Sequence, residues 1–207
     1  MFGKSQKILF DLAVFYLLVL IVSAIAAPLI TPYIPTEQFL SKRFHPPSFD
    51  NIMGTDNFGR DILSRIIYGS RSALIVGIVT VTIALAIGMA IGLLAGMGSK
   101  SLDNVLMLFM DSLLSFPTIL LAITVVSFLG YGIVQVMLAL GIISSPVFAR
   151  LIRAETLAIK TEGYVEAAKA LGTSSFKIAF RHIIPNLLGK VAVQCSLTFG
   201  QAIVIES

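Results

Sequence analysis

Three long stretches of this chain contain no charged side chain, and they constrain its fold more than any other feature. They cover residues 12–30, 72–99 and 112–149, which are 19, 28 and 38 residues long. About 20 apolar residues in a helix cross the hydrocarbon core of a bilayer. Hydrophobic residues make up 57% of the chain and charged residues 13%, against about 25% charged in a soluble domain. The sequence therefore predicts an all-α protein that crosses a membrane several times.

These runs and one further apolar stretch predict five membrane-spanning helices. The longest run exceeds one helix, so we divide it at a Gly-Tyr-Gly turn. The predicted spans cover residues 8–30, 72–97, 104–128, 133–149 and 187–205. A secretory signal peptide is the alternative for the first span, but its run exceeds the usual length of about 7–15 residues and no small-residue cleavage site stands out. We predict an N-terminal part, residues 1–71, with one span and an outer loop, and a core, residues 72–207.

The basic residues are divided unequally between the two predicted sides of the membrane. Of 15 Lys and Arg, ten lie at the N-terminus, at residue 100 or between residues 150 and 190, and five lie in the outer loop. Lys and Arg concentrate in cytoplasmic loops, so the N-terminus is predicted to be cytoplasmic. The basic residues form no continuous stripe, and no nucleic-acid partner is expected.

Several classes of chemistry find no support in the sequence. Cys195 is the only cysteine, so neither a disulfide nor a cysteine metal site is expected. His45 and His182 lie on opposite predicted sides of the membrane, and neither has a carboxylate cluster beside it. Residues 92–101 contain glycines and a lysine, but not at phosphate-loop spacing. We therefore predict no catalytic site, no metal site and no cofactor bound by this chain.

Two features inside the spans suggest helix contacts or function. Gly88, Gly92 and Gly96 repeat every four residues, a stripe that favours close helix packing over a pore role. Asp111 lies within the third predicted span, where an ionisable group is a functional candidate. The alternative is that Asp111 reaches the membrane interface or a neighbouring helix. In the outer loop, Asp61 and Arg65 stand four apart and predict a short amphipathic helix over residues 61–68.

The inner segment, residues 161–186, has the most informative pattern. Tyr164, Ala167, Ala168 and Leu171 share one face of a predicted helix that Gly172 ends in a left-handed conformation. A second helix is predicted from an N-cap at Thr173 to Pro185. The alanine face of the first helix fits either close docking against another protein or a resting position on lipid headgroups.

Three segments resemble one known family, the inner-membrane permeases of ABC importers in their peptide and nickel branch. Residues 166–172 and 181–186 are similar to its EAA motif. Residues 54–65, reading GTDNFGRDILSR, together with Gly69 and Arg71, are similar to a GTD-x-x-GRD-x-x-SR stretch. Asp111 with residues 115–117 resembles a D-x-x-x-SFP pattern.

This resemblance implies a cytoplasmic coupling helix, residues 162–171, that docks on an ATPase subunit. The residues implied in docking or in the geometry of the returning loop are Tyr164, Glu166, Ala167, Ala168, Leu171, Gly172, Arg181, His182, Pro185 and Asn186, with Asp111 as a candidate for the translocation path. The implied partners are two ABC ATPase subunits using ATP and Mg, a second homologous permease, an extracytoplasmic substrate-binding protein and the lipid bilayer of a bacterial or archaeal cell (inner) membrane.

The family usually has six spans, and here the sixth is expected to be missing. The implied cargo is peptides, nickel or metal chelates. A secondary transporter subunit and a non-transporting structural membrane subunit stay open as alternatives.

Overall fold

The computed structural model describes residues 4–130 and 132–206, and this part of the chain is helical apart from its loops and one isolated bridge between Thr55 and Asp61. It divides into two compact units, Met1–Ile75 and Val76–Ser207. The division falls within one long helix, which also contains the predicted division after residue 71.

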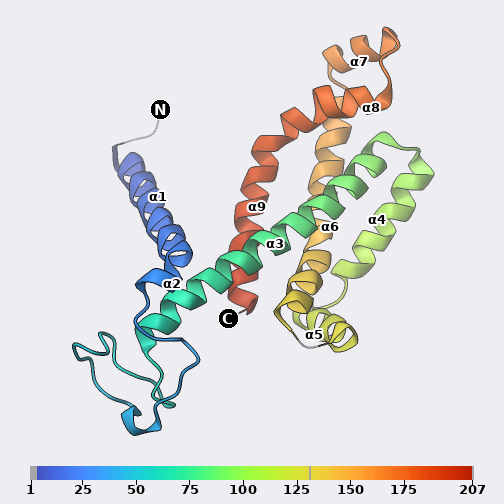
Figure 1. Cartoon of the computed structure of the whole chain (residues 1–207). Coiled ribbons are helices and arrows are strands. Elements are labelled where there is room, and N and C mark those ends of the chain that lie inside the picture. The colour runs from blue at the N-terminus through green and yellow to red at the C-terminus, as the bar shows by residue number, and fades with distance from the viewer. Residues whose placement is uncertain (1–3, 131, 207) are drawn as a thin grey trace. The chain divides into compact units, whose positions relative to one another are not determined.

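The helices follow the predicted order with several changes of boundary. The first unit contains α1 (Lys4–Ile25), α2 (Ala27–Ile30), the 3-10 turn η1 (Leu40–Lys42) and the start of α3 (Ile62–Met97). The second contains the rest of α3, then α4 (Lys100–Leu114), α5 (Thr118–Leu129), α6 (Ile133–Lys160), α7 (Gly163–Ala170), α8 (Ser175–Ile178), the π-helical turn η2 (Ala179–Ile183) and α9 (Ile184–Glu206). Within the second unit, α7 and α8 lie at one end and α5 at the other (Figure 1).

Three described helical segments are long and apolar enough to cross a membrane. They are Ile62–Met97, Ile133–Lys160 and Ser175–Ile205, and α4 with α5 makes a fourth if this bent pair is one span. The apolar part of α1, Asp11–Ile25, is shorter. The chain is therefore a polytopic helical membrane protein, and each of the five predicted spans corresponds to at least one of these helices.

The third predicted span is not one straight helix. It breaks between α4 and α5, which meet at an angle of 96°. Pro117 lacks a backbone N–H and adopts an extended ψ of 125° at the N-cap of α5. The third predicted span was expected to start at residue 104, but Ser99 caps α4 and Lys100 already begins the helix.

The fourth predicted span was expected to end at residue 149, but α6 continues to Lys160. Pro146 lies inside it and leaves the carbonyl of Ile142 without its usual backbone donor. The hydroxyl of Ser145 donates to that carbonyl at 2.8 Å and replaces the lost bond. The helix therefore passes the proline.

The outer loop has a defined fold built around two carboxylates. Asp56 accepts hydrogen bonds from the backbone N–H groups of Phe58 and Arg60, at 2.8 and 3.0 Å, and pairs with the guanidinium groups of Arg60 and Arg65. Asp61 accepts from the Ser64 N–H at 2.8 Å and so caps α3. The predicted Asp61–Arg65 pair and separate amphipathic helix are therefore wrong, since Arg65 pairs with Asp56 and α3 runs on without a break.

Replacing Asp56 with asparagine is expected to loosen this loop. Burial raises the pKa of Asp56, but hydrogen bonds from Arg60 and Phe58 outweigh it and hold the pKa at about 2, below the ordinary 3.8. A lowered pKa means that the stabilisation is complete above about pH 4 and is lost as the pH falls through 2. Pepsin cleavage of the loop should therefore be faster in Asp56→Asn than in wild type at pH 4, and the difference should shrink towards pH 2. Asp50→Asn, an exposed carboxylate, is the control; equal cleavage of all three proteins at pH 4 would contradict the prediction.

The second unit is held together by close contact between α3 and α6. A Cβ on Gly92 would lie 2.8 Å from both the Ala149 carbonyl oxygen and the Ile152 Cβ, and one on Gly96 would lie 2.6 Å from the Thr156 methyl carbon. The predicted packing role of the glycine stripe is confirmed. The core beside it contains Ala84, Phe148, Ile152, Ile183, Leu187 and Val191.

Candidate functional site

The predicted inner helix is present as α7. Glu162 occupies the N-cap position with an extended backbone, the helix covers Gly163–Ala170, and Leu171 follows it. Gly172 has φ of +78°, the left-handed conformation expected of a residue that ends a helix. These local features follow from sequence because each depends on residues a few positions apart.

The face that α7 buries is not the predicted alanine face. Val165 is 2% exposed and belongs to one core cluster with Ile159, Ile178 and Ile183, which we call the anchor cluster. On the predicted face, Tyr164 and Ala167 are exposed, Ala168 is half-buried and Leu171 is 86% exposed. Glu166 is exposed as well. The alanine face and its acidic neighbour are therefore open to a partner while Val165 holds the helix.

The beginning of α7 is also hydrogen-bonded to the beginning of α9. The side-chain amide of Asn186 donates to the Tyr164 hydroxyl at 3.2 Å and to the His182 carbonyl at 2.6 Å. The rings of Tyr164 and His182 lie 5.9 Å apart. Arg181 and Pro185 are exposed nearby. The structure thus brings the residues of the two motif halves to the same end of the unit.

The second predicted helix has different boundaries. Its N-cap is Ser174, whose hydroxyl accepts from the Lys177 N–H, and not Thr173. Pro185 does not end it either, because the chain passes through η2 directly into α9. In this π-helical turn the Ile184 N–H donates to the Ala179 carbonyl, five residues back, so the hydrogen-bond pattern has already shifted where Pro185 enters.

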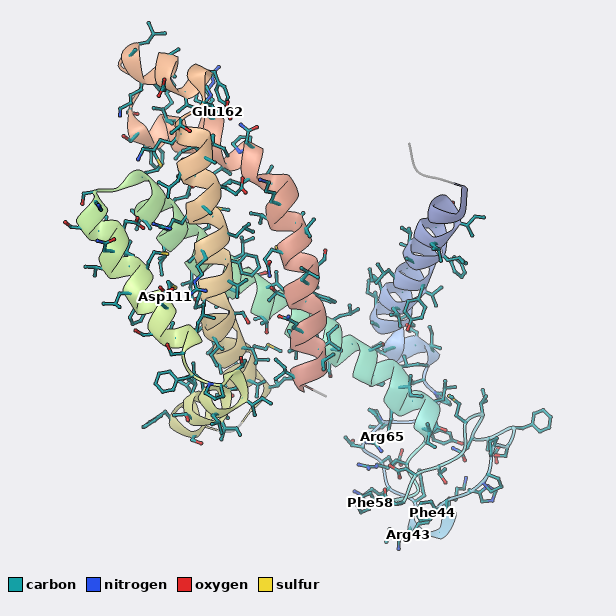
Figure 2. The ribbon with its side chains drawn as sticks, turned by 180° about the vertical axis from the view of Figure 1, so that it is seen from behind. Arg43, Phe44, Phe58, Arg65, Asp111 and Glu162 are labelled. Atoms are coloured by element: carbon teal, nitrogen blue, oxygen red, sulfur yellow. The ribbon has the colours of Figure 1, made fainter. Side chains whose placement is uncertain are left out.

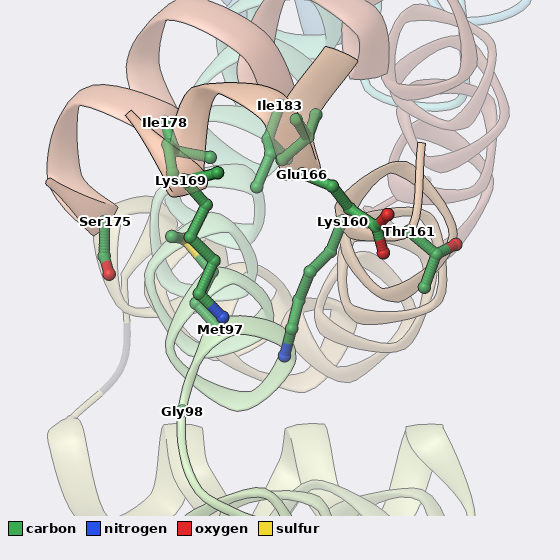
Figure 3. Close-up of a pocket in the computed structure, with 11 residues that line it drawn as sticks. Met97, Gly98, Lys160, Thr161, Glu166, Lys169, Ser175, Ile178 and Ile183 are labelled. Carbon is green, nitrogen blue, oxygen red and sulfur yellow. The ribbon is translucent and has the colours of Figure 1, made fainter. Parts of the chain in front are cut away.

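A cavity of about 690 Å³ separates part of α7 from the end of α3 (Figure 3). Its charged lining comes from Lys160, Glu166 and Lys169, and its apolar lining includes Met97 and Val165. The Lys160 ammonium donates to the Gly96 carbonyl at 3.3 Å. On this side α7 therefore leaves open space beside the anchor cluster.

Asp111 lies on α4, away from the inner loop near Glu162 (Figure 2). It pairs with Arg150 of α6, whose Nε and Nη2 both donate to Oδ1, at 3.0 and 2.7 Å. Sequence reasoning assigned Arg150 only to the basic inner side and missed this pair. The one signal was the opposite charge of these two residues, each next to a long uncharged run.

A second ion pair joins the same helices. Arg153 donates from Nε to Oδ1 of Asp103 and from Nη2 to Oδ2, the latter at 2.6 Å. Both carboxylate oxygens are used, so this pair has the two-pronged geometry that fixes two side chains firmly. It fastens the beginning of α4 to the C-terminal part of α6.

Comparison with known proteins gives a consistent result. Residues 88–206 match the family described as binding-protein-dependent transport system inner membrane component. The chain is 42% identical to a dipeptide transport system permease protein of Alkalihalophilus pseudofirmus, over 88% of this chain and 60% of that protein. It is 40% identical to a glutathione transport system permease protein of Pectobacterium atrosepticum, over 91% of this chain and 63% of the relative.

A di/tripeptide transport system permease protein of Pseudomonas aeruginosa is 36% identical over 91% of this chain and 64% of its own length. The chain thus spans somewhat less than two thirds of these relatives. The family match covers more than half of the chain and includes the glycine stripe, Asp111 and the whole inner loop. This chain belongs to the family of binding-protein-dependent transport system inner membrane components.

Proposed function

We propose that this chain is the membrane-spanning permease subunit of an ATP-driven importer of short peptides, and that α7 couples it to an ATPase subunit. The observation that carries this proposal is the orientation of α7. Val165 anchors the helix in the core while Ala167, Leu171 and Glu166 stay exposed. Small side chains let another protein approach the helix backbone closely, and an exposed carboxylate offers it a charged contact.

Further support comes from the connection between α7 and α9. A displacement of α7 would be passed to α6 and α9 through the anchor cluster and through the Tyr164–Asn186 hydrogen bond. Rigid movement of packed helices is a common way to change access to a transport path. In this proposal Gly172, Arg181, His182 and Pro185 set the shape of the returning loop.

The proposed assembly contains two ATPase subunits that use ATP and Mg, a second permease and an extracytoplasmic binding protein. This chain binds no cofactor and catalyses no reaction in it. The N-terminus and α7 face the cytoplasm, consistent with the ten basic residues on that side. The printed names of the relatives specify dipeptides, di/tripeptides and glutathione, which supports short peptides as cargo.

Replacing Glu166 with lysine is expected to abolish ATP-driven peptide uptake without loss of the protein from the membrane. Glu166 is exposed, so reversing its charge should disturb a docked partner more than the fold. The measurement is co-purification of the ATPase subunits together with uptake in vesicles containing the complete complex. We expect both to fall at least tenfold.

Lys177→Glu is the matched control, because it reverses an exposed charge of α8 at the same end of the unit. It should retain ATPase binding. If Glu166→Lys binds the ATPase and imports peptide as wild type does, α7 is not the docking element.

A further inference from the structure

The Asp111–Arg150 pair leaves hydrogen-bonding groups unused. Both donated bonds end on Asp111 Oδ1. Among the described residues, neither Asp111 Oδ2 nor Arg150 Nη1 has a hydrogen-bond partner in the protein. The two side chains are 51% and 53% exposed. The pair therefore presents a free acceptor and a free donor side by side.

The Asp103–Arg153 pair shows that this arrangement is specific to Asp111 and Arg150. In that pair the guanidinium uses both carboxylate oxygens, and the side chains are 14% and 33% exposed. It lies on the same two helices. The Asp103–Arg153 pair therefore fastens α4 to α6 with both carboxylate oxygens in use. The Asp111–Arg150 pair, which we call the open pair, can still bind a further charged group.

A groove of about 760 Å³ is lined by residues of α4, α5, α6 and α9. Leu114 and Val147 line it, and Asp111 and Arg150 each lie three residues from one of these, which places them on the same helix faces one turn further on. Polar side chains from three helices also line the groove: Thr118, Ser144, Ser196 and Gln201. Its volume falls within the range of about 300–1,000 Å³ that small-molecule sites occupy.

Asp111 lies within the third predicted span, and Arg150 directly follows the fourth. Charged groups at such positions usually face a water-filled cavity or a path rather than lipid. A pair that served only to join α4 and α6 would duplicate Asp103–Arg153 and would gain from using both oxygens. Its half-exposed position, one helical turn beyond residues that line the groove, indicates a ligand that carries both signs of charge.

We propose that Asp111 and Arg150 together bind the charged ends of a peptide in transit, Asp111 taking the α-ammonium and Arg150 the α-carboxylate. This proposal rests on the proposed function and adds a peptide-binding site to it. The ends of an extended dipeptide lie about 7 Å apart, so the ion pair opens and is replaced by one contact to each end. Two charge-assisted contacts form where one was broken, and no charge is left unpaired. Without peptide the two side chains neutralise each other.

The test is uptake of four short peptides by vesicles containing the complete complex: one with free ends, one N-acetylated, one C-amidated and one with both changes. In wild type, blocking either end should raise KM at least tenfold. Asp111→Asn should lose the penalty for N-acetylation and keep that for C-amidation, and Arg150→Gln should do the reverse. Asp111→Glu keeps the charge and should retain both penalties.

Asp103→Asn is the control, and its four KM values should keep the wild-type ratios even if less protein assembles. Unchanged ratios in Asp111→Asn and Arg150→Gln would overturn the proposal, whether overall uptake is normal or uniformly low. A wild-type complex that imports none of the four peptides would instead contradict the proposed function.

Discussion

Replacing Gly92 with leucine is expected to prevent stable folding of the second unit. A Cβ at this position meets the Ala149 carbonyl oxygen and the Ile152 Cβ at 2.8 Å, and a leucine adds three further carbons. Overpacking usually costs about 1–3 kcal/mol, and here the obstacle includes backbone that moves only if α6 moves. The gain in helix propensity, about 1 kcal/mol, is smaller. We expect a loss of more than about 3 kcal/mol, measured as a lower thermal midpoint of the purified chain in detergent.

Gly189→Leu is the matched control, because a Cβ there has nothing within 4 Å. The same substitution in α9 should leave the midpoint unchanged or raise it slightly through propensity. If Gly92→Leu were as stable as Gly189→Leu, the close contact between α3 and α6 would be wrong.

Replacing Val165 with aspartate is expected to detach α7 from the unit. Val165 is 2% exposed in the anchor cluster, and an unpaired carboxylate there costs several kcal/mol. The cavity beside α7 means that few other contacts oppose its release. At about 3 kcal/mol the detached population rises roughly a hundredfold, since each 1.4 kcal/mol is a factor of ten. Trypsin cleavage after Lys169 should therefore accelerate strongly, and peptide uptake should be lost.

Leu171→Asp separates anchoring from docking. Leu171 is 86% exposed, so aspartate there should leave the trypsin cleavage rate near that of wild type. Uptake should nevertheless fall, because the charge lies on the proposed docking face. Equal cleavage rates in Val165→Asp and Leu171→Asp would show that Val165 does not hold α7 in place.

Local features of this protein could be predicted from sequence, whereas pairings between distant segments could not. The position of α7 follows from the spacing of its apolar residues and from Gly172, all within about ten residues. The partner of Val165 could not be found this way, because Ile178 approaches it only after the turn beyond α7. Asp111 was a candidate on its own, but its pairing with Arg150, 39 residues away, depends on how α4 packs against α6.

The different effects of the two prolines in the predicted third and fourth spans could not be predicted from the sequence either. Pro117 and Pro146 carry the same intrinsic penalty in a helix. The helix survives at Pro146 because the Ser145 hydroxyl bonds the carbonyl that proline leaves free. Before Pro117, the Ser115 hydroxyl bonds the Asp111 carbonyl instead, which is not the carbonyl four residues before the proline. Ser145 directly precedes its proline, whereas Ser115 lies two residues before Pro117. The helix is continuous in the first case and broken in the second.

The π-helical turn η2 contains one residue more than a regular helical turn would need. Ile178 and Ile183 are both buried although five positions separate them, and Leu187 and Val191 then follow at intervals of four. Each residue turns an α-helix by about 100°. The additional residue therefore sets the rotational phase between the membrane helix and the loop that precedes it, and so determines in which direction the exposed alanines of α7 face.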